Sequence, residues 1–200
     1  ALARDGLADV VHRPRNGGKG AAVKTGLAAA RDAGFSHALQ VDADGQHDLG
    51  DVPRFLAAAR DRPEALVLGA PRFDETAPTA RRVGRKMTAF WVGVEVGRGV
   101  IDDAMCGFRV YPVGPAVAVR ARGDAMDFDP EIAVRLVWAG LPVVHVPTRV
   151  RYLAADEGGV SHFRLVRDNA RISALHARLS IERFFTRLLR LGRGRRALPR

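Results

Sequence analysis

The chain has 200 residues, 47% hydrophobic and 27% charged, enough to bury the core of one α/β domain. Its single cysteine, Cys106, excludes an internal disulfide framework and a cysteine-rich zinc module. No apolar run reaches the roughly 18 residues that span a bilayer, and no hydrophobic leader is seen, so we expect a cytoplasmic, reducing location. The net charge of +10 favours an anionic partner, although an arginine-rich proteome would give the same excess.

Strand-like and helix-like patterns alternate along the chain. In chain order we expect strand 8–12, helix 20–33, strand 35–41, helix 52–59, strand 65–68, helix 81–96, strand 108–111, helix 130–139, strand 141–146 and helix 164–179, with loops at 69–78 and 154–159. This order predicts a three-layer α/β/α sandwich with a mainly parallel sheet. Open α/β sheets bind ligands at the carboxyl ends of their strands, so the segments that follow the strands are the candidates for a site.

The strongest of these segments is residues 41–48, directly after an apolar strand. Asp42 and Asp44 are spaced i and i+2, and the amide of Gln46 follows at i+4. Carboxylate and amide oxygens are the ligands that Mg²⁺ and Mn²⁺ prefer, usually together with substrate phosphates. An acidic turn without any ligand would use the same residues. The spacing is not that of an EF-hand, because no glutamate closes the loop.

A glycine-rich segment, residues 16–20, precedes the first predicted helix and contains Lys19. Glycines let a backbone approach a ligand closely, and a helix N-terminus favours phosphate. The segment fails the P-loop pattern because Gly20, not serine or threonine, follows Lys19. It also fails the dinucleotide pattern, because Val23 stands where a third glycine is needed. A glycine-rich turn with a solvated lysine is the alternative.

Residues 102–109 place Asp103 six positions before Arg109, across a tight glycine turn. This spacing would bring a base and a phosphate-binding guanidinium into one cleft. No cysteine–histidine signature makes Cys106 a nucleophile, so we interpret it as a small buried residue.

Two further segments carry polar groups ahead of helices. In residues 126–131 we expect Asp129 to cap a helix, which leaves the roles of Asp127 and Glu131 open. Residues 158–164 combine two glycines with His162 and Arg164, which is typical of a loop that closes over a ligand and also of an ordinary polar loop.

Taken in chain order, these five segments resemble the family 2 glycosyltransferases of the GT-A fold, and most closely their dolichyl-phosphate mannose synthase-like branch. The resemblance runs from residue 16 to residue 171. Residues 161–163, with 168, 169, 171–173 and 176, resemble a subgroup found with aryl-polyene pigment pathways. The family's opening Pro-x-Tyr-Asn-Glu-like turn and its Asp-Asp-Gly-Ser segment have no counterpart here. We therefore expect a GT-A domain without its first βαβ portion, weaker in nucleotide binding and stability than a longer chain.

The resemblance implies a metal-dependent, inverting transfer of a sugar from a nucleotide-diphosphate sugar to an acceptor, a lipid-linked or polyene compound among the candidates. It implies that Mg²⁺ or Mn²⁺ is held by Asp42, Asp44 and Gln46. It implies that the donor and its diphosphate are contacted by Lys19, Asp42, Arg109, His162 and Arg164. By position, Asp103 is the first candidate for the general base and Glu131 the second. A lipid phosphate acceptor is already ionised and needs a strong base less.

The resemblance assigns residues 1–179 to the glycosyltransferase domain and leaves 180–200 as a basic tail. From Arg183 to Arg200 there are seven arginines and no acid. Residues 181–191 form an amphipathic segment that would lie on an anionic membrane, as in a peripheral membrane protein. The alternative is a helix packed on the domain through Phe184, Leu188 and Leu191.

Two other function classes compete with the enzyme. One is a truncated, inactive relative that works as an adaptor, favoured by the missing opening motifs. The other is a nucleic-acid binder, suggested by the charge of +10. Aromatic residues make up only 6% of the chain, which argues against base stacking, so nucleic acid is not the expected partner.

Overall fold

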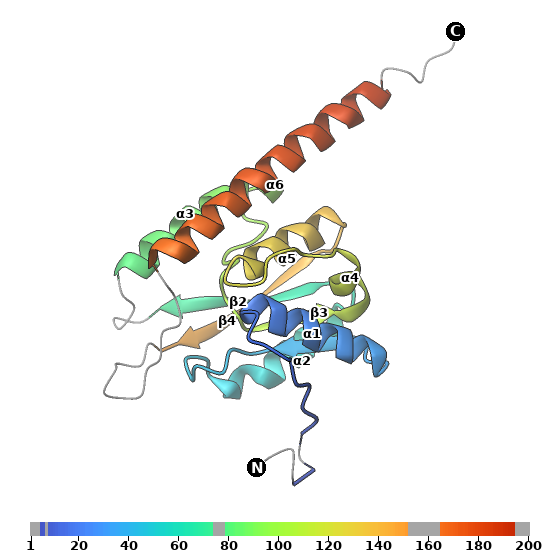
Figure 1. The fold of residues 1–200 in the computed structure, drawn as a ribbon, viewed down its shortest axis with the longest axis vertical. Helices are drawn as coiled ribbons and strands as arrows, with labels where there is room; N and C mark the ends of the chain where they lie inside the picture. The colour runs from blue at the N-terminus through green and yellow to red at the C-terminus, as the bar shows by residue number, and fades with distance from the viewer. Residues whose placement is uncertain (1–4, 7, 74–78, 152–164, 195–200) are drawn as a thin grey trace.

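The computed structural model describes residues 5–6, 8–73, 79–151 and 165–194. These ranges hold a four-stranded sheet with the order β1-β3-β2-β4. The strands are β1 (His37–Gln40), β2 (Leu66–Phe73), β3 (Arg109–Pro112) and β4 (Val143–Val150). The helices are α1 (Lys19–Asp32), α2 (Val52–Asp61), α3 (Thr79–Val96), α4 (Val113–Ala118), α5 (Phe128–Trp138) and α6 (Leu165–Gly194), with a short 3-10 turn η1 (Leu49–Asp51) before α2. Figure 1 shows their arrangement.

The sheet is mixed. β2 and β4 pair in parallel, whereas β3 runs antiparallel to both of its neighbours, β1 and β2. β1, β2 and β4 therefore point the same way and β3 alone opposes them. The expectation of a mainly parallel sheet holds for strand direction, but two of the three pairings are antiparallel. Because β3 is reversed, the segment before it lies at the edge where the segments after the other strands lie.

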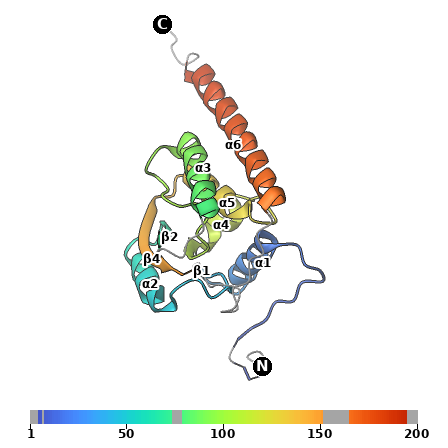
Figure 2. The same cartoon turned by 90° about the vertical axis from the view of Figure 1, so that its left-hand side faces the viewer.

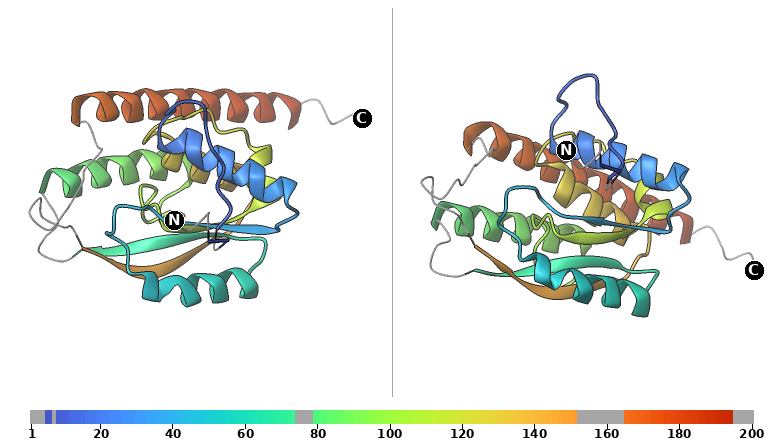
Figure 3. Two further views of the ribbon diagram at one scale, coloured as in Figure 1. Left: turned by 60° about the horizontal axis from the view of Figure 1, so that its bottom comes forward. Right: turned by 90° about the horizontal axis from the view of Figure 1, so that it is seen from below.

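Helices cover both faces of the sheet, as the three-layer prediction requires. Side chains alternate along β2, so Leu66 and Leu68 enter one core while Val67 enters the other. α2 closes the smaller core with Phe55, whose ring stacks on that of Phe108 with centroids 4.0 Å apart. α1, α3, α4 and α5 lie on the opposite side, and α6 lies outermost there (Figure 3). Both faces of β2 are thus buried, which explains its continuous apolar run.

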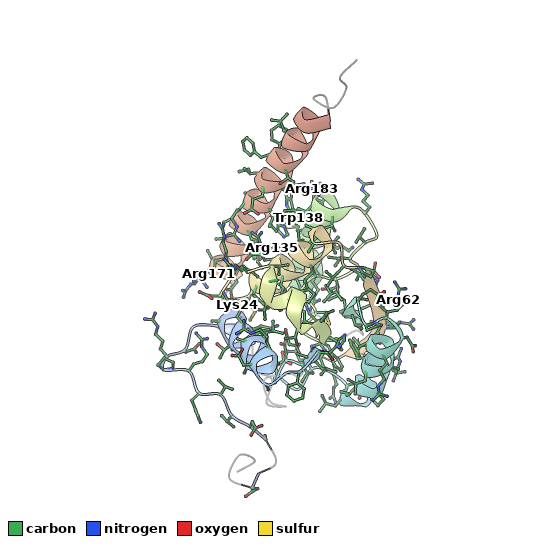
Figure 4. All side chains as sticks on the ribbon, turned by 90° about the vertical axis from the view of Figure 1, so that its right-hand side faces the viewer. Lys24, Arg62, Arg135, Trp138, Arg171 and Arg183 are labelled. Carbon is green, nitrogen blue, oxygen red and sulfur yellow. The ribbon has the colours of Figure 1, made fainter. Side chains whose placement is uncertain are left out.

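α6 is longer than predicted. It runs for 30 residues without a break at residue 179, and its C-terminal part extends beyond the rest of the domain (Figures 1 and 2). Phe184 is 63% exposed and Leu188 is 53% exposed, so the alternative of a helix packed on the domain through these two residues is wrong. The side chain of Leu191 lies outside the described residues. Nearer the domain, the guanidinium of Arg183 lies over the ring of Trp138, 5.9 Å from its centroid (Figure 4).

Three other local predictions differ from the structure. Residues 8–12 form no strand; Val10 and Val11 are exposed, and no described strand pairs with them. The loop expected at 69–78 is wrong in its first half, because β2 continues to Phe73. Residues 74–78 and 154–159 lie outside the described residues. α4 was not predicted, since its sequence contains glycine and proline.

Candidate active site

Loops from several strands meet at one edge of the sheet. Gln40, the last residue of β1, lies opposite Arg109, the first residue of β3. The loop after β1 and the loop before β3 therefore leave the sheet side by side. The carbonyl of Gln46 accepts a hydrogen bond from the N–H of Arg151 at 3.1 Å, which joins the end of β4 to the same place. The first and third predicted segments, residues 41–48 and 102–109, are thereby brought together beside the end of β4.

Lys19, the first residue of α1, joins two carboxylates at this edge. Its ammonium lies 2.7 Å from Asp42 Oδ2 and 2.6 Å from Asp129 Oδ2. Burial by itself would lower the pKa of Lys19, but Asp129 and Asp42 outweigh it, and the pKa is raised. Lys19 therefore stays charged and is not the solvated lysine of the alternative interpretation. It links the acidic loop after β1 to the first turn of α5.

The glycines beside Lys19 serve the packing of α1. Gly18 has φ +95°, and a Cβ there would lie 2.4 Å from the carbonyl oxygen of Asp124. A Cβ on Gly20 would lie 2.4 Å from Cβ of Phe128. The N–H of Ala21 donates to the Asp124 carbonyl at 3.1 Å. The close approach that these glycines permit is therefore to the loop before α5, and the phosphate-cradle interpretation gains no support.

Gly107 makes room for Asp42. A Cβ at position 107 would lie 2.1 Å from Asp42 Oδ2. We expect Gly107→Ala to displace that carboxylate and to weaken metal-dependent binding of a nucleotide sugar by at least about tenfold, as losses of supporting residues around metal ligands do. Isothermal titration calorimetry measures this. Gly26→Ala in α1 is the matched control, because its Cβ meets nothing within 4 Å. Unchanged binding by Gly107→Ala would show that the position of Asp42 does not matter.

Asp103 lies in the loop before β3 and is held in a fixed position. Its side chain is 11% exposed and forms an ion pair with Arg85 of α3. Its Oδ1 accepts a hydrogen bond from the N–H of Met105 at 2.7 Å. The same loop carries Gly107, which contacts Asp42. The first candidate base and the first candidate metal ligand thus lie on neighbouring loops.

The residues predicted to hold a metal form one tight turn. Asp44 Oδ1 accepts a hydrogen bond from the N–H of Gln46 at 3.1 Å, which bends the chain between them. Asp42 and Asp44 each use one carboxylate oxygen in these contacts, and Asp42 is 25% exposed. The donor set of carboxylate and amide oxygens fits Mg²⁺ or Mn²⁺. Among the described residues, no three His, Cys, Asp or Glu side chains gather into a metal site.

Arg109 is part of the fold's interior. Its side chain is fully buried and donates to three carbonyl oxygens, those of Ala104 at 2.6 Å, Cys106 at 2.6 Å and Asp129 at 2.7 Å. This corrects the prediction that it contacts a diphosphate: its guanidinium ties the loop before β3 to α5. Cys106 is buried beside it, and burial raises the pKa of its thiol to about 11. This supports the interpretation of Cys106 as a small buried residue.

Glu131 is also a structural residue in the first turn of α5. It is fully buried, and its Oε2 accepts from the N–H of Gly123 at 2.7 Å and of Arg122 at 3.0 Å. Its Oε1 lies 2.7 Å from Arg135 and 2.8 Å from Arg178. Glu131 is fully enclosed, with its oxygens held by two backbone N–H groups and two guanidinium groups, whereas the Asp103 side chain is 11% exposed. Of the two candidate bases, Asp103 is therefore the better placed to meet an acceptor.

Asp129 and Arg85 are the site residues that sequence reasoning missed. Asp129 was expected to cap α5, but Asp127 occupies that position, and Asp129 is 2% exposed within the first turn. Asp129 stands in an Asp-Pro-Glu sequence that is typical of a helix start, so nothing there indicated an ion pair with Lys19. Nothing in the sequence pointed to Arg85, which lies in a helix far along the chain from Asp103. His162 and Arg164 lie outside the described residues.

The Lys19–Asp129 pair makes stability depend on pH. Burial raises the pKa of Asp129, but Lys19 and Arg109 outweigh it, so its pKa is lowered. A lowered folded-state pKa contributes stability above the unfolded value of about 3.9, and this stability is lost as the pH falls through the folded value. We expect Asp129→Asn to be less stable at pH 7 and to lose less on acidification below about pH 4. Urea unfolding across this range, with the exposed Asp32→Asn as control, measures it; parallel curves for Asp129→Asn and the natural protein would contradict the pairing.

Comparison with known proteins identifies the family. The sequence model of glycosyl transferase family 2 matches residues 1–113, more than half of the chain. The chain belongs to this family. The matched part includes Lys19, the acidic loop and the loop that holds Asp103, so family 2 membership covers these parts of the site.

The chain is also similar to a curated protein. The chain is 28% identical over 154 residues to a protein of Micrococcus luteus named undecaprenyl-phosphate mannosyltransferase. The alignment covers 72% of this chain and 61% of the relative, so the chain spans about three fifths of the relative's length.

Proposed function

We propose that this family 2 protein is a glycosyltransferase that moves a sugar from a nucleotide-diphosphate sugar to a lipid-linked acceptor. The observation that carries the proposal is the convergence of Lys19, Asp42 and Asp103 at one edge of the sheet. The family supports the reaction class, and the printed name of the Micrococcus luteus relative supports a polyprenyl phosphate as the acceptor and mannose as the sugar.

Each residue has a distinct part in the proposal. Asp42, Asp44 and Gln46 would hold Mg²⁺ or Mn²⁺, which neutralises the charge of a departing diphosphate. Lys19 keeps its ammonium beside Asp42, where it holds the carboxylate in place and adds positive charge near the donor phosphates. Asp103 accepts the proton of an acceptor hydroxyl, and Arg85 holds it in position. His162 and Arg164 remain proposals for closing over the diphosphate.

The acceptor decides how much Asp103 contributes. A phosphate acceptor is ionised at neutral pH and brings its own nucleophilic oxygen, whereas a hydroxyl acceptor must lose a proton as it attacks. A polyene acceptor, suggested by residues 161–163, 168, 169, 171–173 and 176, would belong to the hydroxyl class. No helix of the described part of the chain is long and apolar enough to cross a membrane. We propose that a lipid-linked acceptor is reached at the membrane surface and that the tail 180–200 contributes to that contact.

A transfer assay tests the proposal. Radiolabelled GDP-mannose, UDP-glucose and their relatives are incubated with polyprenyl phosphate or with hydroxyl acceptors, with Mn²⁺ or with EDTA. We expect label in the lipid fraction with one donor, and none with EDTA. Binding of a nucleotide sugar without transfer to any acceptor would favour the inactive adaptor instead. Salt-sensitive binding of DNA without nucleotide-sugar binding would favour the nucleic-acid binder.

A further inference from the structure

α3 presents an apolar stripe to solvent. Val83, Met87, Phe90 and Val94 are 52%, 59%, 58% and 48% exposed, and they repeat at helical spacing along one face. Trp91, at the border of this stripe, is 40% exposed, and a shallow hollow of about 350 Å³ lies among these side chains. The buried residues of α3 lie on its opposite face: Thr88, Val92 and Glu95. The stripe is therefore not part of the domain core.

α6 packs beside α3 and repeats the pattern in its C-terminal half. Ile181, Phe184, Phe185 and Leu188 are each more than half exposed. The buried residues of α6 lie on the other side of the helix: Asp168, Ile172, Leu175, His176 and Leu179. The ring of His176 stacks against that of Trp91, with centroids 6.4 Å apart, so the two helices are in direct contact. Together they form a surface with two exposed apolar stripes, which we call the α3–α6 surface.

Charge distinguishes this surface from the rest of the protein. α3 and α6 contain eleven lysines and arginines against three acids, so they supply most of the net charge of +10. The acids are turned inward. Glu95 is fully buried against His176 Nδ1 at 2.9 Å, Asp168 is buried, and Glu182 forms an ion pair with Arg135 of α5. Arg85 and Arg178 also pair inward, with Asp103 and Glu131, whereas Lys86, Arg167 and Arg171 are exposed. The surface therefore combines exposed apolar side chains with exposed basic ones.

We propose that the apolar stripe of α3, with the C-terminal half of α6, docks on an anionic lipid bilayer. Amphipathic helices of this kind bury their apolar face at the level of the headgroups while basic side chains contact anionic lipids. A second copy of the chain would bring two strongly positive surfaces together, which like-charge repulsion opposes. The hollow on α3 is shallow and the apolar residues are spread along two helices, which suits a bilayer better than a peptide.

The docking places the candidate site close to the bilayer. Arg85 of α3 pairs with Asp103, so one helix, about 10 Å across, separates the loop before β3 from the apolar stripe. This consequence rests on the proposed function, because it brings a lipid headgroup within reach of Asp103. The docking itself rests only on exposure and charge.

Vesicle binding tests the docking without any donor or acceptor. The full chain is mixed with vesicles of phosphatidylcholine, with and without phosphatidylglycerol, and the bound fraction is measured by sedimentation. We expect binding to the anionic vesicles only, and the double variant Met87→Ser/Phe90→Ser to bind at least about tenfold more weakly. Leu49→Ser, which changes a residue 63% exposed in η1, is the control and should bind like the natural protein. Melting temperatures show that each variant is folded.

A second readout locates the contact. In a Trp138→Phe background, Trp91 is the remaining tryptophan, and we expect brominated lipids to quench its fluorescence. Three results would overturn the proposal: no binding to anionic vesicles, equal binding by the double variant, or a self-associated protein that the double variant disperses. A chain that binds vesicles and transfers no sugar would refute the proposed function and leave the docking standing.

Discussion

Replacing Arg109 with methionine is expected to lower the free energy of unfolding by about 3–5 kcal/mol, as does breaking a buried charged network by removing one partner. The guanidinium satisfies three buried carbonyl oxygens, those of Ala104, Cys106 and Asp129. Methionine fills similar space and can satisfy none of them. Each carbonyl left without a donor costs about 1–3 kcal/mol, and the buried Asp129 loses a positive neighbour.

Urea unfolding monitored by circular dichroism measures this loss. Arg62→Met is the matched control, because Arg62 is 54% exposed and pairs only at the surface, with Glu64. Surface changes of that kind usually alter stability by less than about 0.5 kcal/mol. If Arg109→Met were as stable as Arg62→Met, the hydrogen bonds from Arg109 to the three carbonyls would not stabilise the fold. The prediction that Arg109 contacts a diphosphate would then be open again.

Replacing Asp103 with asparagine is expected to lower kcat with a hydroxyl acceptor by about 100-fold, the lower end of what general-base catalysis contributes. Asparagine keeps the size of the side chain and the contact with Met105 N–H, but it cannot take a proton. Donor affinity should change by less than about twofold, because the metal ligands are left in place. With a phosphate acceptor the loss should be much smaller.

Steady-state kinetics with both acceptor classes, together with the donor Kd, separates these effects. Asp102→Asn is the neighbouring control: its side chain is 58% exposed and lies 3.9 Å from His145. It should retain the activity of the natural protein. Equal kcat for Asp103→Asn and Asp102→Asn with a hydroxyl acceptor would remove Asp103 as the base.

Local sequence patterns predicted most of the helices and strands because both kinds of pattern are regular here. The apolar run at β2 and the helical spacing of apolar residues in α2 and α5 can be recognised from residues that are close together in the sequence. The direction of β3 could not be predicted in this way, because antiparallel pairing depends on which strand, distant in the sequence, lies beside it. The same reversal explains why residues 102–108, which precede β3, lie at the edge where the loop after β1 also lies.

The sequence indicated which segments form the candidate site, but it indicated the roles of individual residues less well. Asp42, Asp44 and Lys19 follow from chain-local signals, the acidic turn and the helix start. Arg109 has the same charge in a phosphate site and in a buried network, so composition alone does not separate the two. Its complete burial and its three carbonyl acceptors, which only the structure shows, give Arg109 a structural role. Arg85 pairs with Asp103, 18 residues away in the sequence, and Asp129 pairs with Lys19, 110 residues away. No local sequence pattern predicts either ion pair.

The most direct test of the account is calorimetric titration of nucleotide sugars into the natural protein and into Asp42→Asn/Asp44→Asn, with and without Mn²⁺. We expect binding of one UDP- or GDP-sugar that requires Mn²⁺ and is lost in the double variant. The variant Asp32→Asn, changed on the exposed end of α1, should bind like the natural protein. Binding of the same strength in the double variant, or binding indifferent to Mn²⁺, would contradict the placement of the donor site at the acidic loop.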